Sequence, residues 1–339
     1  MCFVILCLKY TNNNRLNLLI YLYLCYMSNS QPIQVTVVIV SYNVCGFVLD
    51  AIKSVYTYLK YPVQIILVDN KSTDGTVQEV KKQYPDVEVV ANTDNRGFSA
   101  ANNQAFALCK GDIIMMLNPD AAFINESINL IIEELVKQSE KDVLIGPRIV
   151  NPDLSYQASC WKFPSPIQHL LELLFLNKLI DTTSYHANDW KQQTRVDFLS
   201  GACIVFSKKT LNKLSGLDEN LFWMDDVDFC RRNIELGGEN YYYPSSAIIH
   251  CIGQSSKKNQ RVVISNQIIS KLKYYCKHNL LGYYVMAVPI FLLQIVTRLP
   301  LFLILGIARP FYFQKAQAYA YTLKRLITYL ITNKQTVVS

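Results

Sequence analysis

The chain has 339 residues, of which 51% are hydrophobic and 17% are charged, and its net charge is +7. That charge is unevenly distributed, because no Asp or Glu follows Glu239 whereas 12 Lys and Arg residues do, which leaves 21 basic and 26 acidic residues before that point. An acidic body with a basic, apolar tail excludes a nucleic-acid binder, which would carry its positive patch on the folded domain, and favours a tail that lies against anionic lipid.

The ten cysteines and the first 32 residues add two expectations. No C-x-x-C pair or metal-finger spacing occurs, and most cysteines lie in apolar runs, which predicts reduced thiols in a reducing compartment. The apolar runs Phe3–Leu8 and Leu16–Tyr26 are each shorter than the roughly 17 residues of a membrane span, and no signal-peptide cleavage site follows them. We therefore expect an N-terminal extension over residues 1–32, with Met27 as an alternative start.

From Val35 onward, short apolar runs typical of buried strands alternate with helix-like segments. This alternation predicts an α/β fold in which helices flank a mostly parallel sheet, with ligands bound beyond the C-terminal ends of the strands. The expected strands are 35–40, 65–68, 87–90, 113–117 and 143–145, and the expected helices are 47–59, a segment that follows 72–75 and runs to about 83, 100–109 and 127–137.

The second half of the chain is less regular. We expect a leucine-rich helix at 168–180, and regular structure that resumes at 196–206 and leads through 208–214 to the acidic cluster. A helix from about 225 to 236 and a strand at 241–249 complete the expected elements. Residues 280–307 are mostly apolar and long enough to span a bilayer, although Pro289 and Pro300 would kink a helix there. A transmembrane helix and an in-plane hairpin both fit, and the basic flanks suit a lipid interface. The expected domains are an extension (1–32), a catalytic domain (33–256) and a helical tail (257–339).

Polar residues follow three of the predicted strands. Ser41-Tyr42-Asn43 ends the first strand, Asp69-Asn70 the second, and Asn118-Pro119-Asp120 the fourth. Each group alone is also typical of a turn, but together, at one edge of a sheet, they predict a ligand site. Asp69 could accept a hydrogen bond from the N–H of a pyrimidine ring, and Asp120 could hold a divalent cation that bridges a diphosphate.

Two further features narrow the ligand. Asn95-Arg96-Gly97 precedes a predicted helix, where backbone N–H groups can approach a phosphate. Neither a G-x-G-x-x-G after the first strand nor a G-x-x-x-x-G-K-[ST] occurs, so the dinucleotide and P-loop interpretations lose their main support.

Three carboxylates, Asp225, Asp226 and Asp228, occupy four positions within an aromatic and apolar segment. Acids this close repel one another and are expensive to desolvate. One explanation is a helix N-terminus capped by Asp225 or Asp226. The other is a site that needs a base or a cation ligand; Asp228 would then point away along the helix and be structural or contact the acceptor.

These motifs resemble inverting family 2 glycosyltransferases with a GT-A fold, and within that family the rhamnosyltransferase-like branch. The first half of the resemblance is carried by Val38–Asn43, Leu67–Gly75, Asn95–Phe98 and Leu117–Asp120. Ser200–Cys203, Gly216–Glu219 and the acidic cluster match the second half, so that the resemblance covers about residues 35–256.

The resemblance implies a role for each candidate residue. It implies Asp226 as the catalytic base with Asp225 beside it, and donor contacts from Ser41, Tyr42, Asn43, Asp69, Asn95, Arg96, Gly97 and Asn118. It implies Asp120 and His250 as metal ligands, and acceptor or sugar contacts from Trp223, Gly201, Ala202 and Asp228. Two positions depart from the family pattern: Asn118 replaces the first acid of Asp-x-Asp, which predicts weaker cation binding, and Asp225 replaces a Glu.

The expected activity is the transfer of a sugar, with inversion, from a nucleoside diphosphate sugar such as dTDP-rhamnose or a UDP-hexose. The expected acceptor is a hydroxyl of a surface glycan or a lipid-linked glycan at the cytoplasmic face of the cell membrane, and the expected cofactor is Mg²⁺ or Mn²⁺. The alternative is a non-catalytic, membrane-attached carbohydrate-binding protein on the same fold.

Overall fold

The computed structural model describes residues 32–177, 179–180, 185, 190–251 and 260–332. The predicted extension over residues 1–32, apart from Pro32, and the alternative start at Met27 lie outside the described residues. The strands are β1 (Val35–Ser41), β2 (Val63–Asp69), β3 (Glu88–Ala91), β4 (Ile113–Leu117), β5 (Ala121–Phe123), β6 (Val143–Val150), β7 (Tyr156–Gln157), β8 (Cys160–Trp161), β9 (Thr194–Arg195), β10 (Phe198–Leu199), β11 (Cys203–Ser207) and β12 (Glu239–His250). The helices are α3 (Cys45–Tyr58), α4 (Thr76–Gln83), α5 (Phe98–Phe106), α6 (Ile128–Lys137), α7 (Pro166–Leu173), α8 (Lys208–Leu214), α9 (Asp225–Glu235), α10 (Gln260–Lys277), α11 (Leu281–Ala308) and α12 (Pro310–Thr332).

The main sheet has the strand order β3-β2-β1-β4-β11-β6-β12-β5. β3, β2, β1 and β4 run parallel, β11 is antiparallel to both β4 and β6, and β12 is parallel to β6. The predicted α/β class with a mostly parallel, helix-flanked sheet is therefore confirmed. The ordered segment expected at 196–206 contains two strands separated by a turn at Gly201–Ala202: β10, which pairs with β8 in a small second sheet, and β11.

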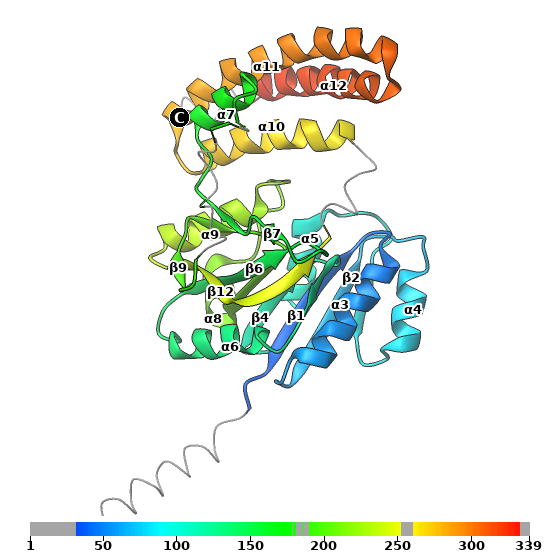
Figure 1. Cartoon of the computed structure of the whole chain (residues 1–339), viewed down its shortest axis with the longest axis vertical. Coiled ribbons are helices and arrows are strands. Elements are labelled where there is room, and N and C mark those ends of the chain that lie inside the picture. Colours follow the sequence, from blue (N-terminus) through cyan, green and yellow to red (C-terminus); the bar gives the residue numbers. More distant parts are fainter. Residues whose placement is uncertain (1–31, 178, 181–184, 186–189, 252–259, 333–339) are drawn as a thin grey trace, which may run out of the picture.

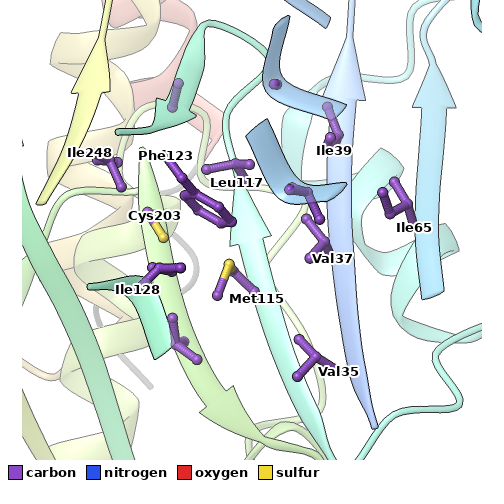
Figure 2. Close-up of a cluster of buried hydrophobic side chains, with 14 of the residues drawn as sticks. Val35, Val37, Ile39, Ile65, Met115, Leu117, Phe123, Ile128, Cys203 and Ile248 are labelled. Atoms are coloured by element: carbon purple, nitrogen blue, oxygen red, sulfur yellow. The ribbon is translucent and has the colours of Figure 1, made fainter. Parts of the chain in front are cut away.

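The apolar core lies on both faces of the sheet. All seven residues of β1 are buried, as expected of a central strand covered on both sides. Val35, Val37 and Ile39 face a cluster with α3 and α6, part of which is drawn in Figure 2. Val38 and Val40 face the opposite cluster, to which α5, α8 and α9 contribute. Burial of both faces fixes the positions of the strand ends.

Helices α10, α11 and α12 stack beyond the sheet together with α7 (Figure 1). α11 is one continuous helix of 28 residues that passes through Pro289 and Pro300. Its most apolar 18-residue window has a mean hydropathy of 2.2 and is 17% buried, so by length and composition it is able to cross a membrane. The buried residues recur every three or four positions, and the remaining apolar residues are largely exposed. Whether α11 spans or lies along the membrane stays a prediction.

The helical tail packs directly against the acid-bearing part of the sheet domain. Leu221, Met224 and Val227 belong to the same buried cluster as Leu272 and Tyr275 of α10. The segment just before α9 therefore rests on α10. The division at residue 256 between a catalytic domain and a tail stays a prediction, and this apolar cluster crosses it.

Candidate active site

The strand register brings the predicted polar strand ends to one edge of the sheet. Ser41 pairs with Asp69 across β1 and β2. β11 runs antiparallel to β4, so its beginning lies where β4 ends, and the N–H of Asn118 donates to the carbonyl of Ala202 over 2.9 Å. The parallel ends of β1, β2 and β4 and the beginning of β11 thus share one edge, where α/β sheets bind ligands.

Two buried oxygens at this edge lack hydrogen-bond partners among the described residues: Asp69 Oδ1 and Ser41 Oγ. The other carboxylate oxygen of Asp69 accepts from the N–H of Ser72 at 2.7 Å, which fixes the orientation of the side chain. A buried polar group without a partner costs about 1–3 kcal/mol. Two such oxygens, opposite each other in the register, indicate a polar ligand that supplies donors.

The loops around these oxygens are tied together by Asn43. This residue adopts a left-handed conformation (φ 53°); its N–H donates to Ser72 Oγ at 2.8 Å, and its Oδ1 accepts from the N–H of Thr73 at 2.7 Å. The loops after β1 and β2 are thus held as one surface beside Asp69. Tyr42, the other residue predicted here, is exposed.

The segment before α5 closes the same edge. Asn95 Oδ1 accepts from the N–H of Gly97, whose φ of 84° favours glycine. Asn70 Nδ2 donates to the carbonyl of Gly97 at 3.0 Å, so the end of β2 supports this turn. Arg96 is exposed. The supporting role of Asn70 was not predicted, although its position directly after Asp69 was the available signal.

Asp225 and Asp226 begin α9, and neither caps it. The N-cap position is Met224, without a side-chain cap, so the predicted capping by Asp225 or Asp226 is wrong. Asp226 Oδ2 instead accepts from the N–H of Gly201 at 3.1 Å, and Oδ1 accepts from the N–H of Val227 at 2.8 Å. Asp225 Oδ2 lies 3.5 Å from Ser99 Oγ, a residue of α5 that sequence reasoning did not identify. The pair therefore contacts the first turn of α5 as well as the turn before β11.

Both carboxyls of the pair resist ionisation. Burial raises the pKa of Asp225 from 3.8 to about 7, and the adjacent charge of Asp226 contributes to the rise. Burial also raises the pKa of Asp226, partly offset by the hydrogen bonds from Gly201 and Val227. The pair therefore retains a proton up to near-neutral pH, as expected of groups that accept and release protons in a reaction.

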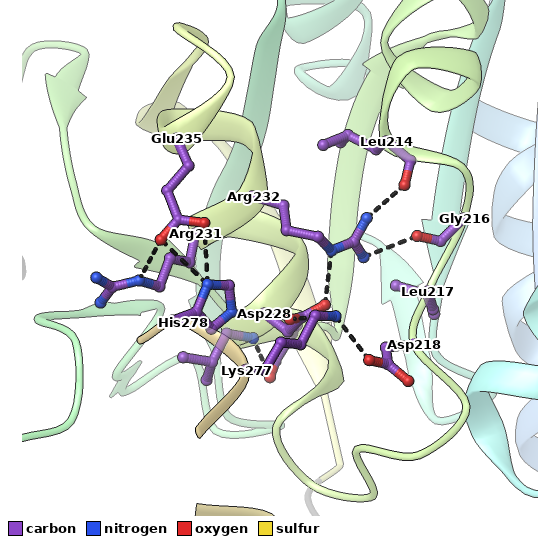
Figure 3. A network of polar contacts seen from close by, with 12 residues as sticks. Leu214, Gly216, Leu217, Asp218, Asp228, Arg231, Arg232, Glu235, Lys277 and His278 are labelled. Atoms are coloured by element: carbon purple, nitrogen blue, oxygen red, sulfur yellow. Dashed lines mark hydrogen bonds and ion pairs between the residues drawn. The ribbon is translucent and has the colours of Figure 1, made fainter. Parts of the chain in front are cut away.

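Of the two roles expected for Asp228, the structure supports the structural one and contradicts the acceptor contact. Asp228 is fully buried in a network of polar contacts that includes Arg232, Lys277 and His278 (Figure 3). Its carboxylate lies 2.7 Å from Arg232 Nε, 2.8 Å from Lys277 Nζ and 2.9 Å from His278 Nε2. Burial would raise its pKa, but the hydrogen bond from His278 and the charge of Arg232 lower it to about 2. Asp228 is a structural anion that joins α9 to the end of α10.

Asp120 and His250, the predicted metal ligands, lie next to each other. Pairing of β12 with β5 places His250 opposite Ala121, and His250 Nε2 is 3.3 Å from Asp120 Oδ1. The other ring nitrogen, Nδ1, lies 2.8 Å from Gln157 Oε1, which leaves Nε2 to face the carboxylate. A carboxylate oxygen and an oriented imidazole nitrogen suit Mn²⁺ or Mg²⁺ as a partial ligand set. Within the described residues no group of three or more His, Cys, Asp or Glu side chains gathers as a metal site.

Trp223, Gly201 and Ala202, which were predicted to contact the acceptor or the sugar, differ in exposure and in the contacts that they make. Trp223 is 41% exposed and has a φ of 77°, an uncommon conformation for a large side chain, and it stands between the buried Leu221 and Met224. Gly201 contributes its N–H to Asp226. Ala202 is 1% exposed, so it takes part through its backbone carbonyl rather than its side chain.

Comparison with known proteins agrees with this geometry. The family described as "Glycosyl transferase family 2" matches residues 36–214. The N-acetylglucosaminyl-diphospho-decaprenol L-rhamnosyltransferase of Mycobacterium tuberculosis is 30% identical over 205 residues, which cover 56% of this chain and 66% of that protein. The pre-mycofactocin glycosyltransferase of the same organism is 26% identical over 199 residues, 56% of this chain and 37% of that protein. The chain thus spans a little under two thirds of the length of the rhamnosyltransferase and a little over one third of the length of the pre-mycofactocin glycosyltransferase.

Among solved structures, the fold is similar to that of the mannosyltransferase PcManGT from Pyrobaculum calidifontis in complex with GDP-Man and Mn²⁺. The TM-score is 0.52 at 16% sequence identity, and the similarity covers 92% of this chain and 94% of that chain. At this identity the likeness concerns the fold, which is the GT-A fold predicted from the sequence.

Proposed function

The chain belongs to glycosyl transferase family 2 and is a glycosyltransferase, and we propose that it transfers a sugar from a nucleoside diphosphate sugar to a hydroxyl of a lipid-linked glycan. The observation that carries this proposal is the pair of unpartnered buried oxygens, Ser41 Oγ and Asp69 Oδ1, at the sheet edge that also holds the acids. A uracil or thymine ring carries an N–H that could donate to Asp69, which favours a UDP or dTDP donor.

The chemistry assigned to Asp226 is that of a general base. Its two oxygens are oriented by the N–H groups of Gly201 and Val227, and its environment raises its pKa. In the proposed reaction it removes the proton from the acceptor hydroxyl as that oxygen attacks the anomeric carbon from the side opposite the diphosphate. The C–O bond to the diphosphate breaks as the new glycosidic bond forms, so the anomeric centre inverts.

The leaving diphosphate needs positive charge. We propose that Arg96, exposed on the loop before α5, and the N–H groups of that loop contact the phosphates. Asp120 and His250 would hold a divalent cation, which when bound supplies charge neutralisation to the diphosphate. Asn118 brings no charge to this group, which predicts modest cation affinity.

The acceptor and the location follow from the tail. The mycobacterial relative is named for a lipid-linked acceptor, and α11 presents an apolar outer surface. We propose that the α11–α12 region associates with the cytoplasmic face of the cell membrane and holds the site next to a lipid-linked glycan.

The test is a donor screen followed by substitution of the acids. Purified full-length protein is incubated with UDP- and dTDP-sugars, and release of nucleoside diphosphate is measured with and without acceptor. Asp226→Asn should lower transfer by about 10²–10⁴-fold while nucleotide binding, measured by thermal shift, stays unchanged. Asp69→Asn should instead weaken nucleotide binding in the same thermal-shift measurement. Transfer that persists in Asp226→Asn would remove this residue as the base.

A further inference from the structure

A cavity of about 420 Å³ lies where the segment before α9 meets α7, α10 and α11. Trp223 and Met224 form part of its wall. Because consecutive Cα atoms are about 3.8 Å apart, the Cα atoms of Trp223 and Asp226 are separated by at most about 11 Å. The volume is within the range of small-molecule sites, about 300–1,000 Å³. The cavity therefore adjoins the segment that leads into the proposed base.

Two side chains of α11 that line the cavity have unsatisfied polar atoms. Gln294 is 6% exposed, and its Oε1 accepts no hydrogen bond from the part of the chain that the structure describes. Arg298 Nε is buried and likewise donates to no described acceptor. A ligand that satisfies both must offer an acceptor to Arg298 and a donor to Gln294.

Arg298 is held in place by its other contacts. Its Nη1 donates to the hydroxyl of Tyr319 at 3.0 Å, and its Nη2 donates to the main-chain carbonyl of Glu172 at 2.5 Å. The guanidinium carbon lies 4.8 Å from the centre of the Phe175 ring. A guanidinium held by these three contacts is pre-organised for a ligand at its Nε–H, which has no described acceptor.

The charges around the cavity favour an anion. Lys271 and Arg298 bring two positive charges, and Glu172 brings one negative charge, with Lys271 Nζ 3.5 Å from Glu172 Oε2. Burial would raise the pKa of Glu172, but His169 and Lys271 lower it to about 2, so that it is ionised. His169 is neutral at pH 7, because burial lowers its pKa to about 4. One positive charge remains uncompensated in a partly buried site.

The position of these residues on α11 indicates what carries the anion. Gln294 and Arg298 are one helical turn apart, on the face that also holds the buried Phe291, whereas Leu293 and Val296 are more than half exposed. A polar cavity thus lies behind a helix with an apolar outer surface. This arrangement suits a ligand that joins a polar head to a hydrocarbon chain.

We infer, on the basis of the proposed function, that this cavity binds the glycosyl phosphate head of the lipid-linked acceptor. The phosphate accepts hydrogen bonds from Arg298 and Lys271, a sugar hydroxyl donates to Gln294, and the exposed ring of Trp223 provides an apolar face for the sugar. A ligand that carries both a phosphate and a hydroxyl meets both unsatisfied groups.

The inference is tested by binding, which requires no donor. Full-length protein in detergent micelles is titrated with N-acetylglucosaminyl-diphospho-decaprenol, with N-acetylglucosamine 1-phosphate, and with inorganic phosphate, and tryptophan fluorescence is followed. Arg298→Met and Gln294→Met should each weaken binding of the lipid-linked probe at least tenfold. The matched control is Arg309→Met, which removes the same charge from the exposed end of α11 and should leave binding unchanged.

The outcomes separate the two proposals. Weaker binding in both cavity variants but not in Arg309→Met, together with competition by N-acetylglucosamine 1-phosphate, supports the cavity. Competition by inorganic phosphate alone would assign it to free phosphate and overturn the inference, as would equal losses in all three variants, which would indicate adsorption to lipid. Gln294→Met removes a buried unsatisfied oxygen and should not lower the unfolding temperature, so a loss of binding there is not a folding defect. Absence of sugar transfer with intact binding would refute the proposed function and leave the cavity standing.

Discussion

The proton held by Asp225 and Asp226 makes a specific prediction for Asp225→Asn. With a pKa of about 7, Asp225 is ionised in only about one tenth of the molecules at pH 6 and in about nine tenths at pH 8. Because the fully ionised pair is the stronger base, kcat/KM of the wild type should rise as the pH passes through about 7. The neutral amide of the variant cannot repel the charge of Asp226, so the rise in kcat/KM should occur at lower pH than in the wild type.

The same substitution predicts a change in stability. The pKa of Asp225 is raised in the folded state, so folding becomes less favourable as the pH rises from 3.8 to about 7, and above that the difference reaches about 4 kcal/mol. Asp225→Asn should therefore raise the unfolding temperature at pH 8 and have little effect at pH 4.

Two measurements on one variant check this reasoning: the pH profile of kcat/KM and thermal unfolding between pH 4 and pH 9. Ser99→Ala is a control, because it removes the long contact to Asp225 and leaves both carboxyls in place. An unchanged acid limb together with no gain in stability at pH 8 would show that the pair does not share a proton near neutral pH.

Two further predictions concern the cation and the buried anion. Chelation should lower turnover, and Mn²⁺ or Mg²⁺ should restore it in the wild type but less completely in His250→Ala; indifference to the chelator would exclude Asp120 and His250 as ligands. Asp228→Asn leaves Arg232, Lys277 and His278 around a neutral side chain and should destabilise the fold by about 3–5 kcal/mol in urea unfolding at pH 7. Because the pKa of Asp228 is lowered to about 2, this contribution is complete above pH 3.8 and disappears as the pH falls through 2, where the variant and the wild type should converge.

The sequence predicted the sheet well because its strands are buried on both faces. β4 is an unbroken apolar run and β1 is apolar from Val37 to Val40, and polar residues mark where both strands end. The direction of each strand could not be predicted in this way, because a buried apolar run has the same pattern in a parallel and in an antiparallel strand. The antiparallel insertion of β11 between β4 and β6, and the short strand β5, depend on contacts between distant segments.

In the acidic cluster too, some features could be predicted from the sequence and others depend on contacts between distant segments. The composition of the cluster left two explanations open, a capped helix N-terminus and a site that needs a base or a cation ligand, and the structure separates Asp225 and Asp226 from Asp228. What the sequence could not predict is the partner of each. Asp226 meets Gly201, and Asp228 meets Lys277 and His278, about 50 positions away along the chain. The cavity behind Trp223 was also beyond prediction, because four separate helices form its wall.

The contact between α9 and α10 has a consequence for any shortened form of this chain. Ending it at residue 256, the expected domain boundary, would remove Lys277 and His278 from Asp228 and uncover Leu221, Met224 and Val227. Such a fragment would lose α10, which supports α9, the helix that carries the acids. The helical tail therefore also supports the folded catalytic part, and we expect a chain shortened at residue 256 to be less stable than the full chain.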